Sequence, residues 1–342
     1  MATEPYRHPV AAGRGAHRPA PGRVGRGVAS ARAALAGNPS DGYGGAVLAL
    51  ALPARRATAR AWRGEAAAVD PPSELVTATV ARFAAELAPA ARDVTSVAWD
   101  TTIPRGVGLG GSSAIVVATL RALCHLWSVA LEPLAMAELA LSIEVDELGI
   151  AAGLQDRIAQ THERLTFMDF GADPPAVRTL DPGLLPPLLV AWRSDSGGHS
   201  GEVHGPLRDR HARGEPVVLR AMRELRRAAH DAARAITCGD HDALRVGVDR
   251  SFEARRSMLA LDPRHVEMIE TARTAGAAAN YAGSGGAIVA VCLDAGHRTL
   301  VEGALRRLGC ETLASGGGAA LEDTAPRPDI CHLSWNEVKS QP

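Results

Sequence analysis

The sequence predicts an α+β protein built from two domains. The chain has 342 residues, more than one typical compact core holds. Its 46% hydrophobic and 22% charged residues are typical of a globular protein. Strand-like segments and helical runs occur in both halves. We expect a tail at residues 1–27, one domain at residues 28–185 and a second at residues 186–342.

Composition excludes several classes of protein. A net charge of −1 gives no indication of the basic surface that binding to nucleic acid or an anionic membrane requires. The sequence contains no run of about 18 apolar residues that would span a bilayer. The five cysteines are scattered without a C-x-x-C pair, which suits free thiols in a reducing compartment. We therefore expect a cytoplasmic protein with no nucleic-acid or membrane partner, and the oligomeric state stays open.

Residues 1–27 differ in composition from the rest of the chain. They have no apolar periodicity and contain a single acid, Glu4. Against it stand Arg7, Arg14, Arg18, Arg23 and Arg26. We interpret this segment as a disordered tail. It is too poor in serine, and lacks the amphipathic stripe, to favour a transit peptide.

The first domain begins with strands and one capped helix. Strands are predicted at Val28–Ala36, Ala46–Leu52, Arg56–Trp62 and Val94–Thr101. A helix is predicted from an N-cap at Ser73 through Leu87, stopped by Pro89. The loop after the first strand presents Asn38, Ser40 and Asp41 as hydrogen-bonding side chains. A plain turn is the alternative interpretation of that loop.

A glycine-dense turn at Gly106–Gly111 separates a strand from a helical pattern. Its glycines permit positive φ, so successive N–H groups can point into one concavity and hold phosphate. Ser112 and Ser113 stand where the helix begins, and we expect them to cap its free N–H groups. From Ala114 to Leu126 the residues are mostly apolar, so this helix is expected to be buried.

Two other nucleotide-binding motifs were weighed for this turn. Gly106, Gly108 and Gly111 literally satisfy the dinucleotide pattern G-x-G-x-x-G. Pro104 interrupts the strand before the turn, however, and Glu132 does not end a second strand, as that pattern requires. A Walker motif is excluded because the only lysine of the chain is Lys339.

Two carboxylates follow on the next predicted helix, Leu134–Leu148, and just after it. Glu144 and Asp156 adjoin apolar or glycine-rich sequence and are the acids expected to be drawn inside. Mg²⁺-dependent phosphoryl transfer needs such a pair, one for the metal and one as a base. The alternative is that both are structural. Asp146 and Glu147 are expected at a solvated helix end.

The second half fits a smaller α/β domain. Its expected elements are strand Leu188–Trp192, helices Pro216–Thr237, Asp242–Leu259 and Asp262–Ala275, and strand Ala287–Leu293. His199, His204 and His211 match no metal-ligand spacing. Leu321–Pro342 is expected to be weakly ordered, with a short strand at Ile330–Leu333.

Three blocks of the sequence resemble those of the GHMP small-molecule kinases. They are Arg32–Asp41, Pro104–Ala114 as the P-x-x-x-G-L-x-S-S-A nucleotide loop, and Asn280–Ala287. Within that superfamily, further segments are most similar to the glucuronokinases. These are Gly37–Asp41, Gly153–Arg157, Ser194–Gly197 and Phe252–Arg256. The blocks occur in the family's order and cover nearly the whole chain after the tail.

The resemblance implies a fold and an activity. It implies a ribosomal-protein-S5-like ATP-binding domain followed by a ferredoxin-like α/β domain. It implies ATP and Mg²⁺ as cofactors, a small-molecule sugar acid as substrate, and phosphorylation of the anomeric hydroxyl of D-glucuronate. The alternatives are a GHMP kinase for another sugar, a non-catalytic sugar sensor on the same fold and, more distantly, a dinucleotide-binding oxidoreductase. Gly197–His204 departs from the glucuronokinase pattern, so sugar identity depends most on that loop.

The resemblance also implies roles for individual residues. Asp156 matches the catalytic aspartate, and Arg32 lies where a basic residue approaches the transferred phosphate. Ser112 with Glu144 matches the Mg²⁺ ligands, and Ser113 is the alternative serine. The nucleotide loop comprises Pro104, Arg105, Gly106, Val107, Gly108, Leu109, Gly110, Gly111, Ser112, Ser113 and Ala114. The substrate residues implied are Asn38, Ser40, Asp41, Arg157, Ser194, Asp195, Ser196, Gly283, Ser284 and Gly285. For the sugar carboxylate the candidates are Arg157, Arg193, Arg208 and Arg255, and no spacing chooses among them.

Overall fold

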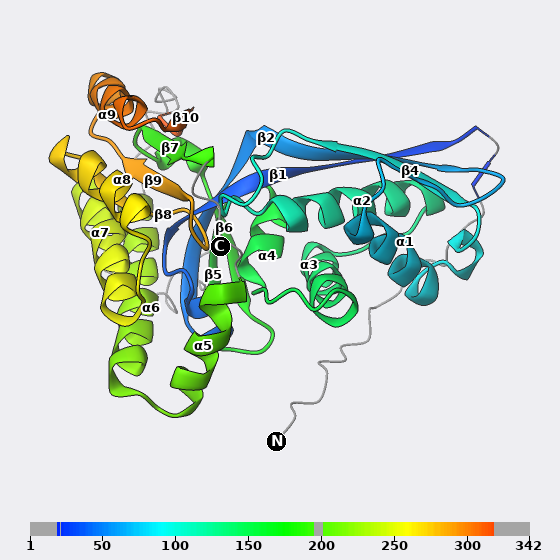
Figure 1. The fold of residues 1–342 in the computed structure, drawn as a ribbon, viewed down its shortest axis with the longest axis horizontal. Helices are drawn as coiled ribbons and strands as arrows, with labels where there is room; N and C mark the ends of the chain where they lie inside the picture. The colour runs from blue at the N-terminus through cyan, green and yellow to red at the C-terminus, as the bar shows by residue number, and fades with distance from the viewer. Residues whose placement is uncertain (1–18, 21, 195–200, 318–342) are drawn as a thin grey trace.

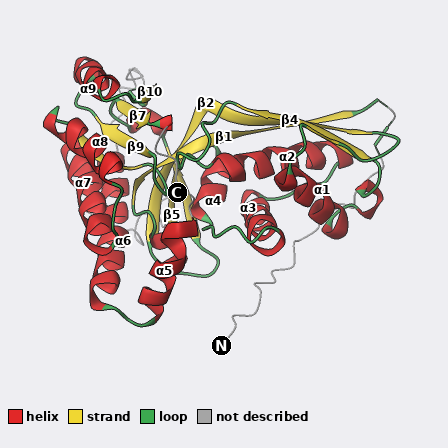
Figure 2. Cartoon of the chain, viewed as in Figure 1, coloured by secondary structure: helices red, strands yellow, loops and turns green. Residues whose placement is uncertain are grey.

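A computed structural model describes residues 19–20, 22–194 and 201–317, and Figure 1 shows two sheets side by side, each covered by helices. The N-terminal sheet has the order β3-β4-β2-β5-β6, with β1 paired to β2. The C-terminal sheet has the order β10-β7-β9-β8. The predicted α+β class is confirmed, with strands and helices in both halves (Figure 2).

The N-terminal sheet precedes the C-terminal sheet in the chain. Its strands are β1 Val24–Ala36, β2 Ala46–Arg63, β3 Val69–Asp70, β4 Thr95–Thr101, β5 Leu165–Asp169 and β6 Ala176–Leu180. The helices of this half are α1 Glu74–Glu86, α2 Gly111–Trp127, α3 Pro133–Ser142 and α4 Gln155–His162. A π-helical turn, Ile143–Glu147, follows α3, and 3₁₀ turns occur at Ser40–Tyr43, Pro89–Ala91 and Pro182–Leu184.

The second sheet is formed by shorter strands. These are β7 Leu188–Trp192, β8 Ala278–Tyr281, β9 Ala287–Val291 and β10 Glu311–Ser315. The accompanying helices are α5 Gly201–Ala212, α6 Pro216–Cys238, α7 His241–Met258, α8 Pro263–Thr274 and α9 Ala295–Arg307. Asp262 caps α8 by accepting from the Arg264 N–H, with Pro263 at the first position, as the sequence predicts. In the part of the chain that the structure describes, no helix is long and apolar enough to cross a membrane.

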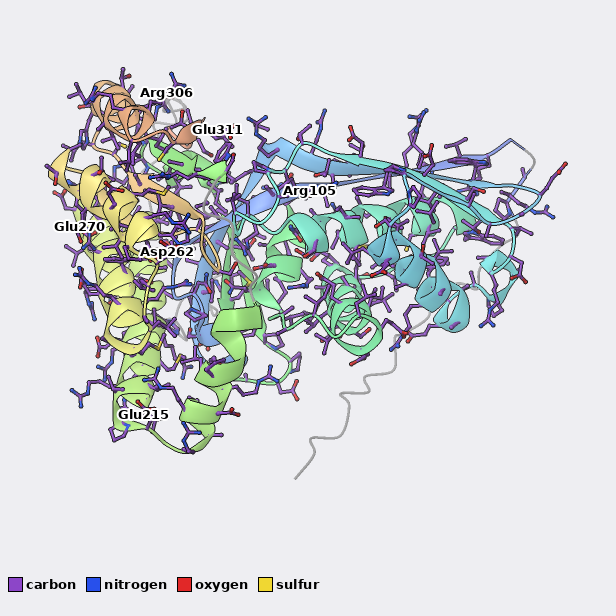
Figure 3. All side chains as sticks on the ribbon, in the orientation of Figure 1. Arg105, Glu215, Asp262, Glu270, Arg306 and Glu311 are labelled. Carbon is purple, nitrogen blue, oxygen red and sulfur yellow. The ribbon has the colours of Figure 1, made fainter. Side chains whose placement is uncertain are left out.

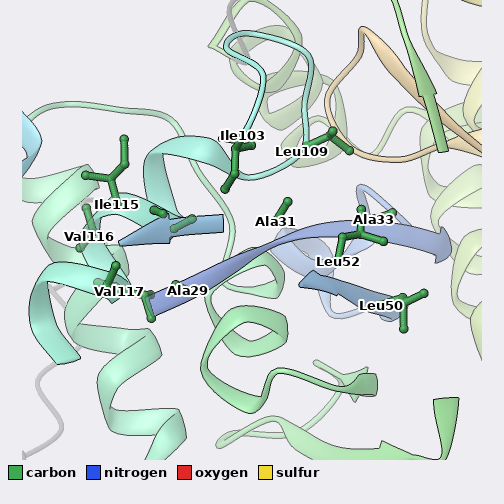
Figure 4. Packing of buried hydrophobic residues seen from close by; sticks show 14 of the residues in the cluster. Ala29, Ala31, Ala33, Leu50, Leu52, Ile103, Leu109, Ile115, Val116 and Val117 are labelled. Carbon is green, nitrogen blue, oxygen red and sulfur yellow. The ribbon is translucent and has the colours of Figure 1, made fainter. Parts of the chain in front are cut away.

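Helix α2 is buried along most of its surface, as its apolar composition predicts, and it packs on β1 among other elements. Figure 4 shows Val116 and Val117 of this helix near Ala29 of β1. The approach is close because β1 is built from small residues. A Cβ added at Gly25 or Gly27 would lie 2.0 Å from a carbonyl oxygen of α2. These glycines let helix and strand backbones meet.

The structure corrects two predicted boundaries. Val24–Gly27, assigned to the tail, belong to β1 and pair with β2 from Trp62 to Ala59. Ala46–Leu52 and Arg56–Trp62 form one strand, because the register shifts at Ser30 and lets β2 continue past Pro53 as an irregularity. The predicted strand Ile330–Leu333 lies outside the described residues.

Candidate active site

A cavity of about 740 Å³ is lined by the glycine-rich turn that precedes α2 and is reached by Ser284 of the second half. It brings together most of the residues that the sequence assigned to a site. Those lining it are Arg32, Asn38, Asp41, Pro104, Arg105, Gly106, Gly108, Leu109, Gly110, Gly111, Ser112, Asp156, Arg157 and Ser284. This volume is within the usual range for small-molecule sites.

The first loop is anchored to the core at alternate residues. Val107 and Leu109 are buried, whereas Gly106, Gly108 and Gly110 have φ of 72°, 74° and 75°. Only glycine adopts this left-handed conformation without strain. The Arg32 N–H donates to the Leu109 carbonyl at 3.1 Å, which ties the loop to β1. The loop is thus fixed in shape before any ligand arrives.

Helix α2 begins earlier than the paired serines suggest. Its N-cap is Gly110, which makes no side-chain capping bond, and the first helical bond runs from the Ala114 N–H to the Gly110 carbonyl. Ser113 donates its hydroxyl to that same carbonyl at 3.1 Å, so the predicted serine caps are wrong. Gly111 and Ser112 line the cavity in the first turn, whose N–H groups precede the helical ladder. An anion is favoured there.

The second glycine loop, Ala282–Gly286, connects β8 to β9 and lies against the first. A Cβ added at Gly283 would lie 2.0 Å from the Gly108 carbonyl oxygen. A Cβ at Gly286, where φ is 86°, would lie 2.7 Å from the Val107 Cα. Ser284 reaches the cavity lining, whereas the predicted Gly283 and Gly285 do not. The absence of a side chain at Gly283 and Gly286 permits the backbones of the two halves to come into contact.

Arg32 and Asp156 form a two-pronged ion pair. The Arg32 Nε donates to Asp156 Oδ1 at 2.6 Å, and Nη2 donates to Oδ2 at 2.7 Å. Arg32 Nη1 donates to the carbonyls of Gly108 at 2.8 Å and Ala282 at 2.7 Å. The Arg32 side chain is 4% exposed and that of Asp156 18%. One arginine therefore connects β1, α4 and both glycine loops.

Glu144 pairs with Arg157 instead of lining the cavity. Arg157 donates to Glu144 Oε2 from Nε at 2.8 Å and from Nη2, and to the Gly153 carbonyl at 2.7 Å. Burial lowers the pKa of Arg157, but the charges of Glu144 and Asp156 outweigh it and raise the pKa above its usual value. Glu144 Oε1 is buried and has no hydrogen-bond partner among the described residues.

Asn38, Asp41 and Gln155 form a polar cluster in the cavity wall. Gln155 Nε2 donates to Asn38 Oδ1 at 3.0 Å and to Asp41 Oδ1 at 3.1 Å. Burial, and then the charge of Asp156, raise the pKa of Asp41 to about 6. Gln155 was not predicted as a site residue. Its position in the Gly153–Arg157 block, next to Asp156, could have indicated that it belongs to the site.

Two predicted substrate residues lie away from the cavity. Ser40 is fully buried and donates to the Ala46 carbonyl at 3.1 Å. Ser194 is exposed and donates to Glu311 Oε1 at 2.8 Å. The predicted Asp195 and Ser196 lie outside the described residues.

An apolar part of the lining was missed by the sequence analysis. It consists of Pro72, Leu75, Trp99, Ile103 and Ile115. Trp99 is held by its indole N–H, which donates to the Pro71 carbonyl at 2.8 Å. No pattern in the sequence joins these residues, because they come from β4, α1, α2 and the adjoining loops.

The four arginines considered for a carboxylate have different surroundings. Arg157 is paired with Glu144, and Arg255 is buried against the second glycine loop. Arg193 lies 3.7 Å from Glu267. Arg208, on α5, is exposed and close enough to Tyr43 to influence its titration. Arg105 also is exposed; it lines the cavity from the first loop (Figure 3).

Comparison with known proteins defines the class. Residues 74–164 match the family model for the GHMP kinases N terminal domain. Phosphomevalonate kinase from Streptococcus pneumoniae, in complex with phosphomevalonate and AMPPNP, has a TM-score of 0.71 at 16% identity, covering 85% of this chain and 99% of that one. Galactokinase from Lactococcus lactis, complexed with galactose, has a TM-score of 0.70 at 14% identity, covering 86% and 94%. Residues 74–164 therefore match a GHMP kinase N-terminal domain, and the chain has the two-domain fold of these kinases.

Within this class, the sequence is similar to the glucuronokinases. Glucuronokinase 1 from Arabidopsis thaliana is 38% identical over 212 residues, which are 58% of this chain. The chain spans 57% of the length of that relative in this match.

Proposed function

We propose that this protein is a GHMP-type kinase that transfers the γ-phosphoryl group of ATP to the anomeric hydroxyl of D-glucuronate, giving glucuronate 1-phosphate and ADP. The observation that carries the proposal is the Arg32–Asp156 pair, which lies where both glycine loops meet in one cavity. The similarity to a glucuronokinase supports the choice of sugar.

The first glycine loop and the start of α2 bind the phosphates of ATP in this proposal. Left-handed glycines let backbone N–H groups approach an anion, and the N-terminus of α2 adds partial positive charge. Arg105 lines the cavity beside them and supplies a guanidinium. The apolar lining around Trp99 and Leu75 would receive the adenine ring.

Asp156 acts as the base toward the sugar hydroxyl. Arg32 donates to both carboxylate oxygens of Asp156, and Asp156 lines the cavity that would receive the substrate. As the sugar oxygen meets the γ-phosphorus, Asp156 accepts its proton while Arg32 offsets negative charge at the transferring group. Arg32 thus fixes the orientation of the Asp156 carboxylate.

The residues assigned to Mg²⁺ fit a cation. Ser112 lines the cavity. Glu144 does not line it but pairs with Arg157, which does, and its Oε1 has no hydrogen-bond partner among the described residues, so a cation would satisfy that oxygen. Arg157 compensates the other oxygen of Glu144. We infer that Ser112 and Glu144 would hold Mg²⁺, which supplies positive charge to the phosphate oxygens.

The polar cluster of Asn38, Asp41 and Gln155 binds sugar hydroxyls. Gln155 orients both neighbours, since its amide donates to each.

The proposed setting is the cytoplasm, and the free thiols of Cys124 and Cys292 are consistent with it.

A coupled ATP-consumption assay tests the proposal with D-glucuronate, D-galacturonate, D-glucose and D-galactose. We expect kcat/KM for glucuronate to exceed that for either neutral hexose by at least about a hundredfold, the worth of a lost charged contact of roughly 3 kcal/mol. Galacturonate should be the best competitor, because it keeps the carboxylate. If a neutral hexose has the highest kcat/KM, glucuronate is not the preferred substrate. If ATP is not consumed with any of the four sugars, the protein is not a kinase for these sugars.

A further inference from the structure

Arg255 of α7 is a buried cation, 2% exposed, that forms no ion pair with a carboxylate among the described residues. Burial lowers its pKa to about 10, with a further lowering from Arg32 against a raising effect of Tyr281. Burying an unpaired guanidinium is costly, so the contacts that compensate it carry information.

Those contacts lead to the second glycine loop. Arg255 Nη1 donates to the Gly283 carbonyl at 2.7 Å, and Nη2 donates to the Ser284 carbonyl at 2.8 Å. The guanidinium lies over the Tyr281 ring, 4.4 Å from its centroid. A planar fork thus holds two successive carbonyls of the loop from the side of α7.

The same loop also contacts Arg32 of the proposed catalytic pair and the first glycine loop. The Ala282 carbonyl accepts from Arg32 Nη1 at 2.7 Å, and Gly283 lies against the Gly108 carbonyl. Arg32 in turn donates to both oxygens of Asp156. A continuous set of hydrogen bonds therefore runs from α7, through the loop, to the base.

We propose that Arg255 is a positioning residue for phosphoryl transfer: by fixing the Gly283 and Ser284 carbonyls, it keeps Arg32 directed at Asp156 and the two glycine loops in register. The inference rests on the proposed kinase function, and it assigns to α7 a role in the reaction although α7 contributes no residue to the cavity lining.

Arg273 provides a matched control on the neighbouring helix α8. Its guanidinium lies 4.6 Å from the centroid of Phe252 of α7, and it pairs with Glu253 at 2.6 Å and Asp249 at 2.9 Å. Arg255 and Arg273 therefore both stack on an aromatic ring of this half. The hydrogen bonds of Arg273 described in the structure go to residues of α7 and none to a glycine loop.

The experiment compares Arg255→Met, Arg255→Lys and Arg273→Met with the unchanged full-length protein. It measures kcat, KM for ATP and for glucuronate, Tm, and hydrogen exchange in peptides covering residues 106–110 and 282–286. We expect Arg255→Met to lose about a hundredfold in kcat, as for a small misplacement of reacting groups, and to exchange faster in both loops. Arg255→Lys should recover part of kcat, because an ammonium donates to carbonyls without the fork.

Arg273→Met should lower Tm while kcat and loop exchange stay as in the unchanged protein. If Arg255→Met and Arg273→Met have the same kcat at a temperature where both are folded, the positioning role is refuted. If both Arg255 variants fail to fold, Arg255 is a structural residue and the proposal is equally overturned. Should the unchanged protein phosphorylate no sugar, the kinase function fails, and the exchange data alone still decide whether Arg255 holds the loops.

Discussion

Arg32 and Asp156 lie 124 positions apart in the chain, yet the geometry of one depends on the other. Asp156 stands at the second position of α4, where a carboxylate is also favoured by the helix N-terminus. Arg32 arrives from the middle of β1 and is nearly fully buried. The carboxylate is therefore held by two independent elements, which is the rigidity that a positioned base needs.

Asp156→Asn should reduce kcat by on the order of 10²–10⁴, the usual worth of a general base. ATP binding should persist, because the glycine loop is unchanged. Steady-state kinetics and calorimetric titration with ATP measure the two effects. Asp146→Asn is the matched control, since Asp146 is exposed and lies away from the cavity. Normal turnover by Asp156→Asn would show that the carboxylate is structural.

Asp41 gives a prediction about pH. Its pKa is raised from 3.8 to about 6 by burial and by Asp156, so the folded protein binds this proton more tightly than the unfolded chain does. Its contribution to stability is therefore present below about pH 4 and is lost as pH rises to about 6.

Asp41→Asn removes that titration. The Tm of the variant minus the Tm of the unchanged protein should become more positive between about pH 4 and pH 6, and level off above. Thermal unfolding at half-unit intervals of pH measures the difference. A difference that stays constant over the range would mean that Asp41 titrates normally.

At the scale of elements, the two glycine loops depend on backbone contact. Gly283→Ala would place a methyl group 2.0 Å from the Gly108 carbonyl oxygen and 2.7 Å from Arg32 Nη1. The loops must then separate, and Arg32 must shift. We expect kcat to fall by about a hundredfold. In Gly303→Ala, the control on α9, the nearest atom is 3.6 Å away at the end of a flexible side chain, so kcat should be unchanged. Equal kinetics for the two variants would contradict this account.

The first strand gives a second prediction at this scale. A chain beginning at Val28 lacks four residues of β1 that pair with Trp62 to Ala59, and also Arg23, which donates to Ser128 Oγ at 2.8 Å. Compared with a chain beginning at residue 19, it should lose about 1–3 kcal/mol, since a few backbone hydrogen bonds contribute about 0.5–1.5 each. Urea unfolding measures this. Identical unfolding free energies would mean that this end of β1 contributes nothing.

Local sequence patterns correctly predicted the helices whose ends are marked by capping residues. Ser73 caps α1, and Gly239 ends α6 in a left-handed conformation, both as expected. The end of the predicted tail was missed because Val24–Gly27 contain two glycines and an arginine, a composition that resembles a flexible segment. Those glycines are there to admit α2, a tertiary reason that no local pattern contains.

At the scale of the whole molecule, the sequence identified the polar residues of the cavity better than its apolar ones. Asn38, Asp41 and Asp156 belong to blocks that resemble a family, and all line the cavity. Trp99 and Leu75 belong to no such block, so the sequence did not identify them as lining residues. It also did not reveal the hydrogen bonds of Arg157 to Glu144 and of Arg255 to the second glycine loop. Partners of a buried charge are set by distant segments, which a single sequence does not reveal.

One hydrophobic cluster extends across both sheets. The largest cluster of buried hydrophobic residues includes Leu48 of β2 and Val289 of β9, and Ala34 N–H donates to the Ala282 carbonyl at 2.8 Å. The N-terminal sheet ends at Leu180 and the C-terminal sheet begins at Leu188, but cutting the chain between them would expose this buried cluster. Neither half could be exchanged for that of a relative, as modules are in domain shuffling, without matching the buried surface as well. Changes of substrate in such a lineage would have to come from loops around the cavity, with the two halves inherited together.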